Sequence, residues 1–441
     1  MNNENKRISA ILGAGVNLAF QLRTMPSTSN ITQAVVNASY SVLNYPDFSQ
    51  EQSSLVHDIY HTICQRYTLD ALDPNRSYGI VHFEVIYDVL EELYSFDKYW
   101  RVNRFRNPKE IPPFAYLTHC DIKYKSHHIS QVLRQYIEII MGIVNEYDCE
   151  YDKNKDTVER WYKDFWSLVP LKWDVFTFNY DTTIEKSLPS YEDGFEPIKG
   201  YPFKQMNPLR LLKSEDHTIN HLHGCILYGE NNQSADDRNI SNIYDYSSKD
   251  WYCWPDYQTQ RSYASDQHNQ AGDTIFRSPI ITGLHKTDKI VNMPFDIYRY
   301  NLNRELMANN AILIAGYSFG DLYVNYEIER MRLYHGDKLR VVLIDCWGDL
   351  KKINKRNEIE TLCKYLADFP YKNHDLFEFL CKVMEIAEID CHIFSEKWKY
   401  FQPNVSENGR LMLFIGGIKT AFQFRNEIYQ FLQSYKNAQT P

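Results

Sequence analysis

The sequence predicts an α/β protein: a Rossmann-like, doubly wound, mostly parallel sheet with a large helical insertion and a mixed C-terminal extension. Short apolar runs that stop abruptly at polar or glycine-rich turns recur along the chain, and between residues 173 and 345 they alternate with helical patterns. Strands that alternate with helices in this way are typical of a parallel sheet covered on both faces. Residues 40–166 instead carry long helical periodicities, which predict the insertion.

The composition is that of a globular protein. Of the 441 residues, 44% are apolar and 24% are charged, and the net charge is −9, so a general nucleic-acid-binding surface is not expected. The nine cysteines include no Cys-x-x-Cys pair, which favours free thiols in a reducing compartment. The polar N-terminus lacks an apolar signal core, and no run approaches the roughly 18 apolar residues of a membrane span. We therefore expect a cytoplasmic protein without a membrane partner.

The first apolar run, Ile8–Leu12, stops at Gly13-Ala14-Gly15. A strand, a glycine turn and a helix in this order can form a phosphate-binding edge, because glycine lets the backbone approach a ligand closely. We expect Gly13 and Gly15 to offer backbone N–H groups to a diphosphate, although the third glycine of the dinucleotide fingerprint is missing. Pro26-Ser27-Thr28 follows, and this pattern favours a turn and a helix N-cap.

Two apolar stripes dominate the predicted insertion. His82–Phe96 and Gln131–Tyr147 place apolar residues at helical spacing, which is typical of helices that pack into a core. Between them, residues 97–125 are rich in Arg, Lys and Pro and predict a connecting loop. We interpret its basic cluster, Arg101, Arg104 and Arg106, as solvated.

The centre of the chain is Trp173–Phe178, a buried strand that ends in Asn179 and Asp181. In an open α/β sheet, ligands bind at the carboxyl ends of the strands. Thr182 and Glu185 have the spacing of a capping box for the helix that follows. Asp181 can contact a ribose or only cap that helix.

A second strand, Ile219–Leu222, leads into His223-Gly224. We expect His221 to face away from His223 and to be a packing or surface residue. The long polar stretch 229–273 then suggests a lid or a partner contact.

The remaining elements continue the alternation of strands and helices. Ala311–Ala315 is a fully apolar run that ends in Gly316-Tyr317-Ser318-Phe319-Gly320-Asp321, where Asp321 reads as a helix N-cap. Further predicted strands are Ser278–Thr282, Arg340–Ile344 (ending at Asp345) and Leu411–Ile415, and further predicted helices are Asp296–Asn309, a segment ending near Tyr334, Asp375–Ile386 and Lys419–Ser434. We expect the polar strand ends to converge on one nucleotide pocket.

One interpretation of the chemistry starts from Ser318. Gly316-Tyr317-Ser318-Phe319-Gly320 fits the nucleophile elbow of α/β-hydrolases, with Asp345 as the acid and His374 or His392 as the base. The acid would then follow the serine by only 27 residues, which is cramped for that fold, and the five-residue pattern also arises by chance.

Another interpretation rests on several motifs together. Gly13-Ala14-Gly15, Thr177-Phe178-Asn179-Tyr180-Asp181, His223-Gly224 and Gly316-Tyr317-Ser318 occur in the order seen in sirtuins, which the chain therefore resembles. It most resembles the sirtuin-like, NAD-hydrolysing effectors of bacterial antiphage defence, which share further short motifs. These are Pro26-Ser27-Thr28, Phe83-Glu84, Asn179-Tyr180-Asp181, Leu222-His223-Gly224 and Gly316-Tyr317-Ser318-Phe319-Gly320-Asp321.

The chain departs from the protein deacylases of the sirtuin family in two respects. Those enzymes hold a structural zinc with two Cys-x-x-Cys pairs, which are missing here, so the resemblance implies no metal and favours NAD hydrolysis over deacylation. Position 17 is Asn, where sirtuins usually carry a small hydroxyl residue. On this resemblance, residues 1–39 and 167–348 form the NAD-binding domain, residues 40–166 the helical insertion, and residues 349–441 an extension suited to oligomer or partner contacts.

The resemblance implies an NAD+ glycohydrolase that acts as an abortive-infection effector, with NAD+ as its substrate. Asn179 can pin the ribose and place a water because its amide donates and accepts hydrogen bonds, and His223 is suited to be a base. A homo-oligomer and a trigger are expected, either a HerA-like ATPase or a phage-derived protein. The alternative is a scaffold that binds NAD+ or ADP-ribose without cleaving it. The residues expected to bind NAD+ are Gly13, Ala14, Gly15, Asn17, Thr28, Asp181, Gly316, Ser318 and Asp345.

Overall fold

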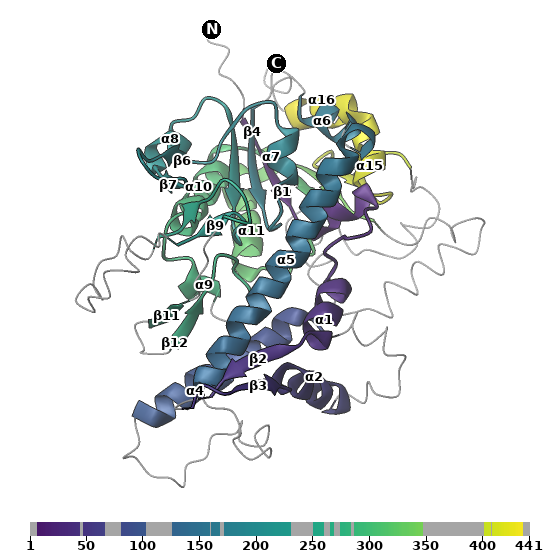
Figure 1. Cartoon of the computed structure of the whole chain (residues 1–441). Coiled ribbons are helices and arrows are strands. Elements are labelled where there is room, and N and C mark those ends of the chain that lie inside the picture. The colour runs from purple at the N-terminus through teal and green to yellow at the C-terminus, as the bar shows by residue number, and fades with distance from the viewer. Residues whose placement is uncertain are drawn as a thin grey trace.

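The computed structural model places a parallel sheet beside a largely helical body, and one long helix, α5 (Ser126–Val158), runs through both (Figure 1). It describes residues 7–44, 47–66, 81–102, 126–158, 160–167, 172–230, 250–259, 265–268, 274–283, 286–346, 401–406 and 408–434. The predicted helix 375–386, Arg104, Arg106, His374, His392 and most of the 229–273 stretch lie outside these residues.

The main sheet has eight strands in the order β15-β16-β14-β13-β1-β4-β8-β5. Neighbouring strands are parallel, except for the antiparallel pair β15–β16. The predicted doubly wound α/β fold is therefore confirmed, and part of the expected C-terminal extension, β15 and β16, joins the same sheet. The strand bounds are β1 Arg7–Leu12, β4 Lys172–Thr177, β5 Tyr191–Glu192, β8 His217–His221, β13 Ala311–Ala315, β14 Arg340–Ile344, β15 Asn404–Val405 and β16 Leu411–Phe414.

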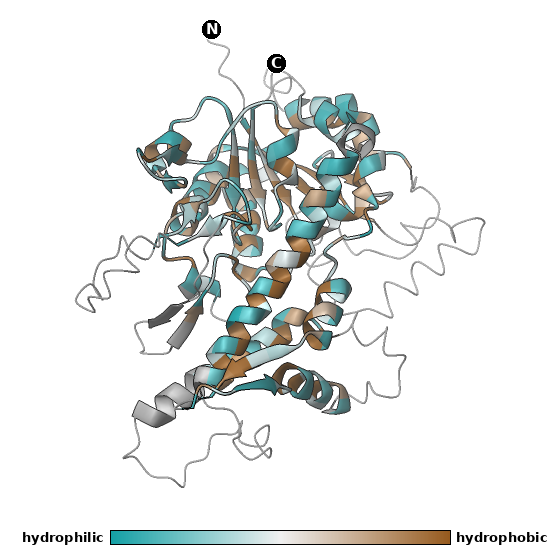
Figure 2. Ribbon diagram, viewed as in Figure 1, coloured by the Kyte–Doolittle hydropathy of each residue, from teal (hydrophilic) through white to brown (hydrophobic). Residues whose placement is uncertain are grey.

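Each face of the sheet packs into its own hydrophobic core. In β1, Ile8, Ala10 and Leu12 point to one face and Ile11 to the other, as the alternation of a strand requires. We name each core after one of its helices. The α10 core contains α10 (Phe295–Ala308) and α11 (Leu322–His335). The α6 core contains α6 (Arg160–Trp166), α15 (Ile418–Ala421) and α16 (Arg425–Gln433). Helices on both faces explain why the central strands are buried and why β13 is apolar throughout (Figure 2).

The insertion is not purely helical, which corrects the expectation for residues 40–166. It begins with an antiparallel hairpin, β2 (Tyr40–Leu43) and β3 (Gln50–Ser53), which follows α1 (Thr28–Asn37) and precedes the helices α2 (Leu55–Arg66), α4 (Phe83–Val102) and α5. Gln131 and Gln135 of α5 bond to Leu43 and Ser41 of β2, so the hairpin is fastened to that helix. Helix α4 also continues to Val102, beyond the point where a loop was expected. Within the described parts of the chain, no helix is long and apolar enough to cross a membrane.

One local expectation was wrong, the strand at 278–282, and the structure adds detail at two other places. A seven-residue 3₁₀ helix, η1 (Ala14–Phe20), follows β1 in place of an α-helix. Residues 278–282 form no strand of the main sheet, and only Ile280 makes an isolated bridge, to Gly224. The chain between β4 and β8 adds β5, a short helix α8 (Pro208–Leu212) and two strands of a second sheet. That sheet has the order β6-β7-β10-β9, with the bounds β6 Phe195–Pro197, β7 Lys204–Met206, β9 Tyr228–Gly229 and β10 Tyr252–Cys253. A separate hairpin pairs β11 (Ser265–His268) with β12 (Thr274–Arg277).

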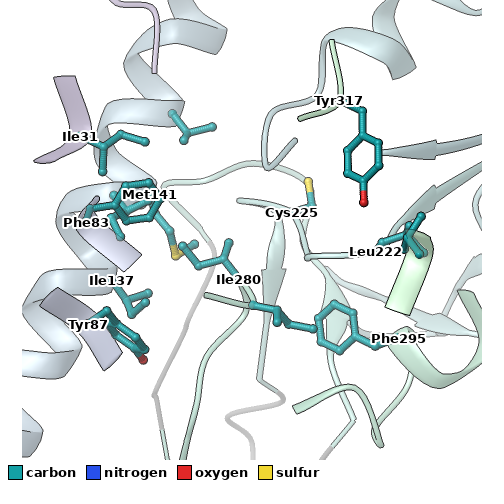
Figure 3. Close-up of a cluster of buried hydrophobic side chains, with 14 of the residues drawn as sticks. Ile31, Phe83, Tyr87, Ile137, Met141, Leu222, Cys225, Ile280, Phe295 and Tyr317 are labelled. Atoms are coloured by element: carbon teal, nitrogen blue, oxygen red, sulfur yellow. The ribbon is translucent and has the colours of Figure 1, made fainter. Parts of the chain in front are cut away.

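Helix α4 holds the segment that follows β12. The ammonium of Lys289, in α9 (Lys286–Lys289), is buried and lies 2.8 Å from the Glu91 carboxylate of α4 and 2.6 Å from the Thr282 carbonyl. Gly283 has φ +77°, and a Cβ there would lie 2.8 Å from Glu91 Oε2, so only glycine fits against α4. Ile280 lies between Met141 on the insertion side and Phe295 on the sheet side (Figure 3). Residues 280–283 and 286–289, the described part of the segment 280–289, therefore connect the insertion to the sheet.

The buried pair of Glu91 and Lys289 gives a test of this connection. Lys289→Met is expected to lower the free energy of unfolding by about 3 kcal/mol, because it leaves the Glu91 carboxylate buried without its partner. Combining it with Glu91→Leu should recover much of that loss, since neither charge then remains. Chemical denaturation of both variants measures the difference, and equal losses in the single and double variants would contradict this account.

Candidate active site

Five parallel strands end in one row. Leu12 of β1 pairs with Thr177 of β4 and with Ala315 of β13, Thr177 pairs with His221 of β8, and Ala315 pairs with Ile344 of β14. The residues that follow these strands therefore share the carboxyl edge of the sheet, where open α/β sheets bind ligands. They are Gly13, Asn179, His223, Gly316 and Asp345. The sequence prediction that the polar strand ends lie together holds for this row.

The glycine loops after β1 and β13 pack directly against each other. A Cβ on Gly15 would lie 2.8 Å from Gly316 Cα, and a Cβ on Gly13 would overlap the Gly316 carbonyl oxygen. The Gly13 and Gly15 N–H groups donate to the carbonyls of Ala315 and Gly316, each at 3.0 Å. The expectation that these two N–H groups face a diphosphate is therefore wrong in this structure, because the neighbouring loop already accepts both. Because these glycines have no side chains, the two loops can pack in close contact.

His223 forms a hydrogen-bonded pair with Asp321, the first non-helical residue before α11. The Nε2 atom lies 2.9 Å from Asp321 Oδ2, and Asp321 Oδ1 accepts from the N–H groups of Tyr323 and Val324. Burial alone would raise the pKa of Asp321, but the hydrogen bond to His223 lowers it to about 2. An ionised Asp321 accepts a hydrogen bond from Nε2–H of His223, as in other aspartate–histidine pairs, and Nδ1 is the ring nitrogen left for another partner.

Aromatic rings fix the position of the His223 ring. Phe178 contacts it edge to face at 4.8 Å between centroids, and Phe178 in turn stacks on Tyr317 at 4.8 Å. The Tyr317 hydroxyl donates to the Asp321 carbonyl at 3.1 Å and to Asn325 Oδ1 at 2.8 Å. Phe178 and Tyr317 thus hold both members of the pair in place. The N-cap expected for Asp321 is confirmed, but its bond to His223 was not foreseen, because 98 residues separate them.

The insertion contributes a second carboxylate near His223. Burial would raise the pKa of Glu84 in α4, but Lys286 and His223 lower it below its usual value. Lys286 lies 3.1 Å from Glu84, and the Ile281 N–H donates to the His223 carbonyl at 2.7 Å. The histidine at the sheet edge is therefore connected to the helical insertion through residues 280–289.

Asn179 is held by its backbone, and its side chain is left for another partner. Its N–H donates to Thr177 Oγ1 at 3.1 Å, and its carbonyl lies 3.1 Å from His221 Nδ1. The side-chain amide makes no hydrogen bond within the described parts of the chain, although Asn179 is only 9% exposed. An amide that has no protein partner at this edge of the sheet is free to bind a polar ligand, because it can both donate and accept hydrogen bonds.

His221 and Glu185 form a buried pair that the sequence did not reveal. His221 Nε2 lies 2.5 Å from Glu185 Oε1 of α7 (Thr183–Ser187). Burial alone would lower the pKa of His221, but the Glu185 carboxylate raises it above its usual value. The predicted capping box is therefore wrong, since Glu185 binds His221 and Thr182 Oγ1 donates to Asp148 of α5 at 2.5 Å. His223 lies beyond the end of β8, so strand alternation does not decide how it faces relative to His221, and no sequence pattern indicated the partner of His221.

Asp181 and Asn17 bond to each other across the ends of β1 and β4. Asn17 Nδ2 donates to Asp181 Oδ2 at 2.6 Å, and Asp181 Oδ1 accepts from the N–H and hydroxyl of Thr183. Protein groups thus occupy both oxygens of Asp181, which supports the capping interpretation over a ribose contact. Asn17 Oδ1 is buried and has no partner in the described chain, so it is a second acceptor that a ligand hydroxyl could satisfy.

The other residues expected to bind NAD+ lie at the same edge or near it. Ala14 and Ser318 are exposed, Asp345 is half-buried directly after β14, and Thr28 begins α1 behind the Ser27 N-cap. The capping role of Ser27 is confirmed by its bond from the Asn30 N–H at 3.1 Å. The strained, left-handed residue of the 316–320 loop is Phe319, with φ +58°, and not Ser318. The geometry of this loop therefore does not favour a nucleophile elbow.

In the described residues, one group of side chains offers three atom types that bind metals. Glu185, His221 and Cys225 place their ligand atoms within 4.8 Å of one another. The His221 nitrogen that a metal would need already shares a hydrogen bond with Glu185. We therefore interpret these side chains as a hydrogen-bonded pair beside a buried thiol.

The site coincides with a match to a known family. Residues 174–365 are similar to the SIR2-like domain, and SIR2-like domains bind NAD+ and belong to NAD-dependent enzymes. The match contains the strands that carry Asn179, His223, Gly316 and Asp345, and it supports a sirtuin-like family and NAD-dependent activity in general. Strand β1, in the middle of the same sheet, precedes the matched residues. A search of curated proteins found no match to the chain.

The His223–Asp321 pair predicts a pH-dependent contribution to stability. Asp321→Asn keeps an N-cap but removes the charge, and should lower the free energy of unfolding at pH 7 by about 1–2 kcal/mol. The folded pKa of about 2 lies below the unfolded value of about 3.9, so this stabilisation is present above pH ~4 and lost as pH falls through 2. Denaturation of both proteins across this range tests it. A difference that stays constant down to pH 2 would contradict the assignment.

Proposed function

We propose that the protein is an NAD+ glycohydrolase, which cleaves the bond between nicotinamide and ribose to give nicotinamide and ADP-ribose. The observation that carries this proposal is the pairing of two features at one sheet edge. Asn179 is 9% exposed and its amide has no protein partner in the described chain, and His223 lies at the neighbouring strand end in a hydrogen bond with ionised Asp321. The similarity of this region to SIR2-like domains supplies NAD+ as the substrate.

The reaction needs little acid catalysis. Nicotinamide is a good leaving group, and cleavage passes through an oxocarbenium-like state, as in other glycosidic hydrolyses. When the bond from the nicotinamide nitrogen to ribose C1 breaks, its electron pair leaves with nicotinamide, and a water oxygen adds to C1. The proton from that water has to reach a base. The chemistry therefore depends on holding the ribose, placing the water and accepting one proton.

The chain offers a group for each task. The Asn179 amide can donate to a ribose oxygen while its carbonyl oxygen accepts from the attacking water. His223 Nδ1 can accept the proton, because Asp321 holds the proton of the neutral ring on Nε2 and stabilises the imidazolium that forms. Asn17 Oδ1 supplies a further buried acceptor. Gly13 and Gly15 shape the loop that faces the ligand, while their N–H groups bind the neighbouring loop.

The proposed role in the cell is that of an antiphage effector that depletes NAD+ during infection. An enzyme with this activity would poison its own cell if it were always on, so low basal activity and a trigger are expected. The trigger would be a HerA-like ATPase or a phage-derived protein, and the active form a homo-oligomer. The contact of His223 with residues 280–289, and of these with α4, supports a route by which a change in the insertion could reach the site.

Substitution of the two candidate catalytic residues tests the chemistry. Asn179→Ala and His223→Ala should each lower nicotinamide release by about 10²–10⁴-fold, the range typical of lost general acid–base or positioning groups. Purified protein is incubated with NAD+, and nicotinamide is measured by chromatography. His57→Ala, which changes an exposed histidine of α2, is the matched control and should retain full activity.

Other outcomes distinguish the alternatives. A scaffold would bind NAD+ in calorimetry and leave it intact even in its assembled form. A serine hydrolase would lose activity only with Ser318→Ala and would cleave nitrophenyl esters. Either result would overturn the glycohydrolase proposal.

Infection of cells tests the biological role. NAD+ should fall in infected cells that express the wild-type protein and stay constant with Asn179→Ala. Infected cells supply the trigger even when it has not been identified. This measurement therefore tests the proposal also when the purified protein shows no activity. An unchanged NAD+ level in wild-type cells that nevertheless resist phage would contradict the effector role.

A further inference from the structure

The carbonyl of Asn179 is hydrogen-bonded to the buried side chain of His221. His221 Nδ1 lies 3.1 Å from this carbonyl oxygen, and because a carbonyl can only accept, Nδ1 carries a proton. His221 Nε2 lies 2.5 Å from Glu185 Oε1, so one further proton is shared between the imidazole and the carboxylate. Both nitrogens of a 2%-exposed ring are thus hydrogen-bonded, and the ring cannot turn without losing both partners.

These hydrogen bonds lie at the end of strand β4, where the chain leaves the sheet. The last ladder residue, Thr177, pairs with His221 itself, and the Leu222 N–H donates to the Thr177 carbonyl at 2.9 Å. Two residues later the chain has left the sheet, and the Asn179 peptide is held by Thr177 Oγ1 at its N–H and by His221 at its carbonyl. The direction of the Asn179 side chain follows from these two bonds, because no hydrogen bond within the described residues reaches its amide.

We infer that His221 and Glu185 are positioning residues for Asn179: they fix its peptide and thereby aim its amide at the ribose and the water. The inference rests on the proposed function, because it assigns a target to that amide. Glu185 belongs to α7, which starts only six residues after β4 ends. One short stretch of chain therefore carries both the Asn179 amide and the carboxylate that holds the His221 ring. His223, two residues after β8 ends, serves the proton.

Two substitutions separate the contact with Asn179 from the contact with Glu185. The amide of an asparagine lies near the position of histidine Nδ1, and that of a glutamine near Nε2. His221→Asn can therefore keep a donor for the Asn179 carbonyl, while His221→Gln keeps the bond to Glu185 and loses Asn179. We expect His221→Gln to lower kcat by about 10–100-fold, as for a misplacement of about 1 Å, with little change in KM, and His221→Asn to retain most of kcat.

A matched control lies on the same strand. His217 is also buried, and its Nδ1 accepts from the Trp173 N–H at 3.0 Å, but it lies at the amino end of β8, away from the site. His217→Gln should reduce thermal stability without the selective loss of kcat. Glu185→Gln should retain more activity than Glu185→Ala, because the amide oxygen still accepts from His221 Nε2–H.

The outcomes separate this inference from the proposed function. If His221→Gln equals or exceeds His221→Asn in kcat while the wild type is active, the positioning role is wrong and the glycohydrolase stands. If the activated wild type releases no nicotinamide, the proposed function fails. Amide hydrogen exchange then decides the inference, since exchange of residues 177–182 should rise in His221→Gln and not in His221→Asn. Zinc bound at one ion per chain would also overturn it, because the metal would take the lone pair of His221 Nε2.

Discussion

The hydrogen-bond register of β1 with its two neighbours decides where the site residues lie. Because Leu12 pairs with both Thr177 and Ala315, and these pair with His221 and Ile344, five strands stop in one row. A shift of β1 by one residue would exchange the residues that face the two cores and would separate Gly15 from Gly316. The close contact of these glycine loops fits only this register. The polar residues after each strand are near one another as a direct result.

Two histidines at the end of β8, His221 and His223, divide the support of the site between two different helices. His223 bonds to Asp321 at the start of α11, and His221 bonds to Glu185 in α7. Each pair joins the end of β8 to a helix that follows another strand of the sheet, α7 after β4 and α11 after β13, so the packing of these helices determines the orientation of the rings. The carboxylates that support the site come from helices, while the groups proposed to meet the substrate come from the edge itself.

The sequence predicted the parts of this structure that depend on local pattern. The central strands were found within one or two residues, because runs such as Ala311–Ala315 are apolar throughout and end at glycine or a polar residue. The hairpin of β2 and β3 was missed, because β3 is a polar and largely exposed strand of four residues without a hydrophobic alternation. The partners of His221 and His223 could not be predicted, since they depend on which helix N-terminus packs beside β8. The Gly13 and Gly15 N–H groups were assigned to a ligand because the sequence could not show that β13 supplies closer acceptors.

The long helix α5 has a consequence for how the molecule unfolds. Its first half, including Tyr136 and Ile140, belongs to the α10 core with α1, α2 and α4, whereas Tyr147 and Tyr151 near its other end belong to the α6 core (Figure 1). Asp148 also accepts from the N–H of Thr182, beside the site. The insertion and the sheet are therefore not separable cooperative units, and melting of one removes packing from the other. Removing residues 40–166 would strip one face of the sheet of part of its cover, so the minimal folding unit includes both bodies.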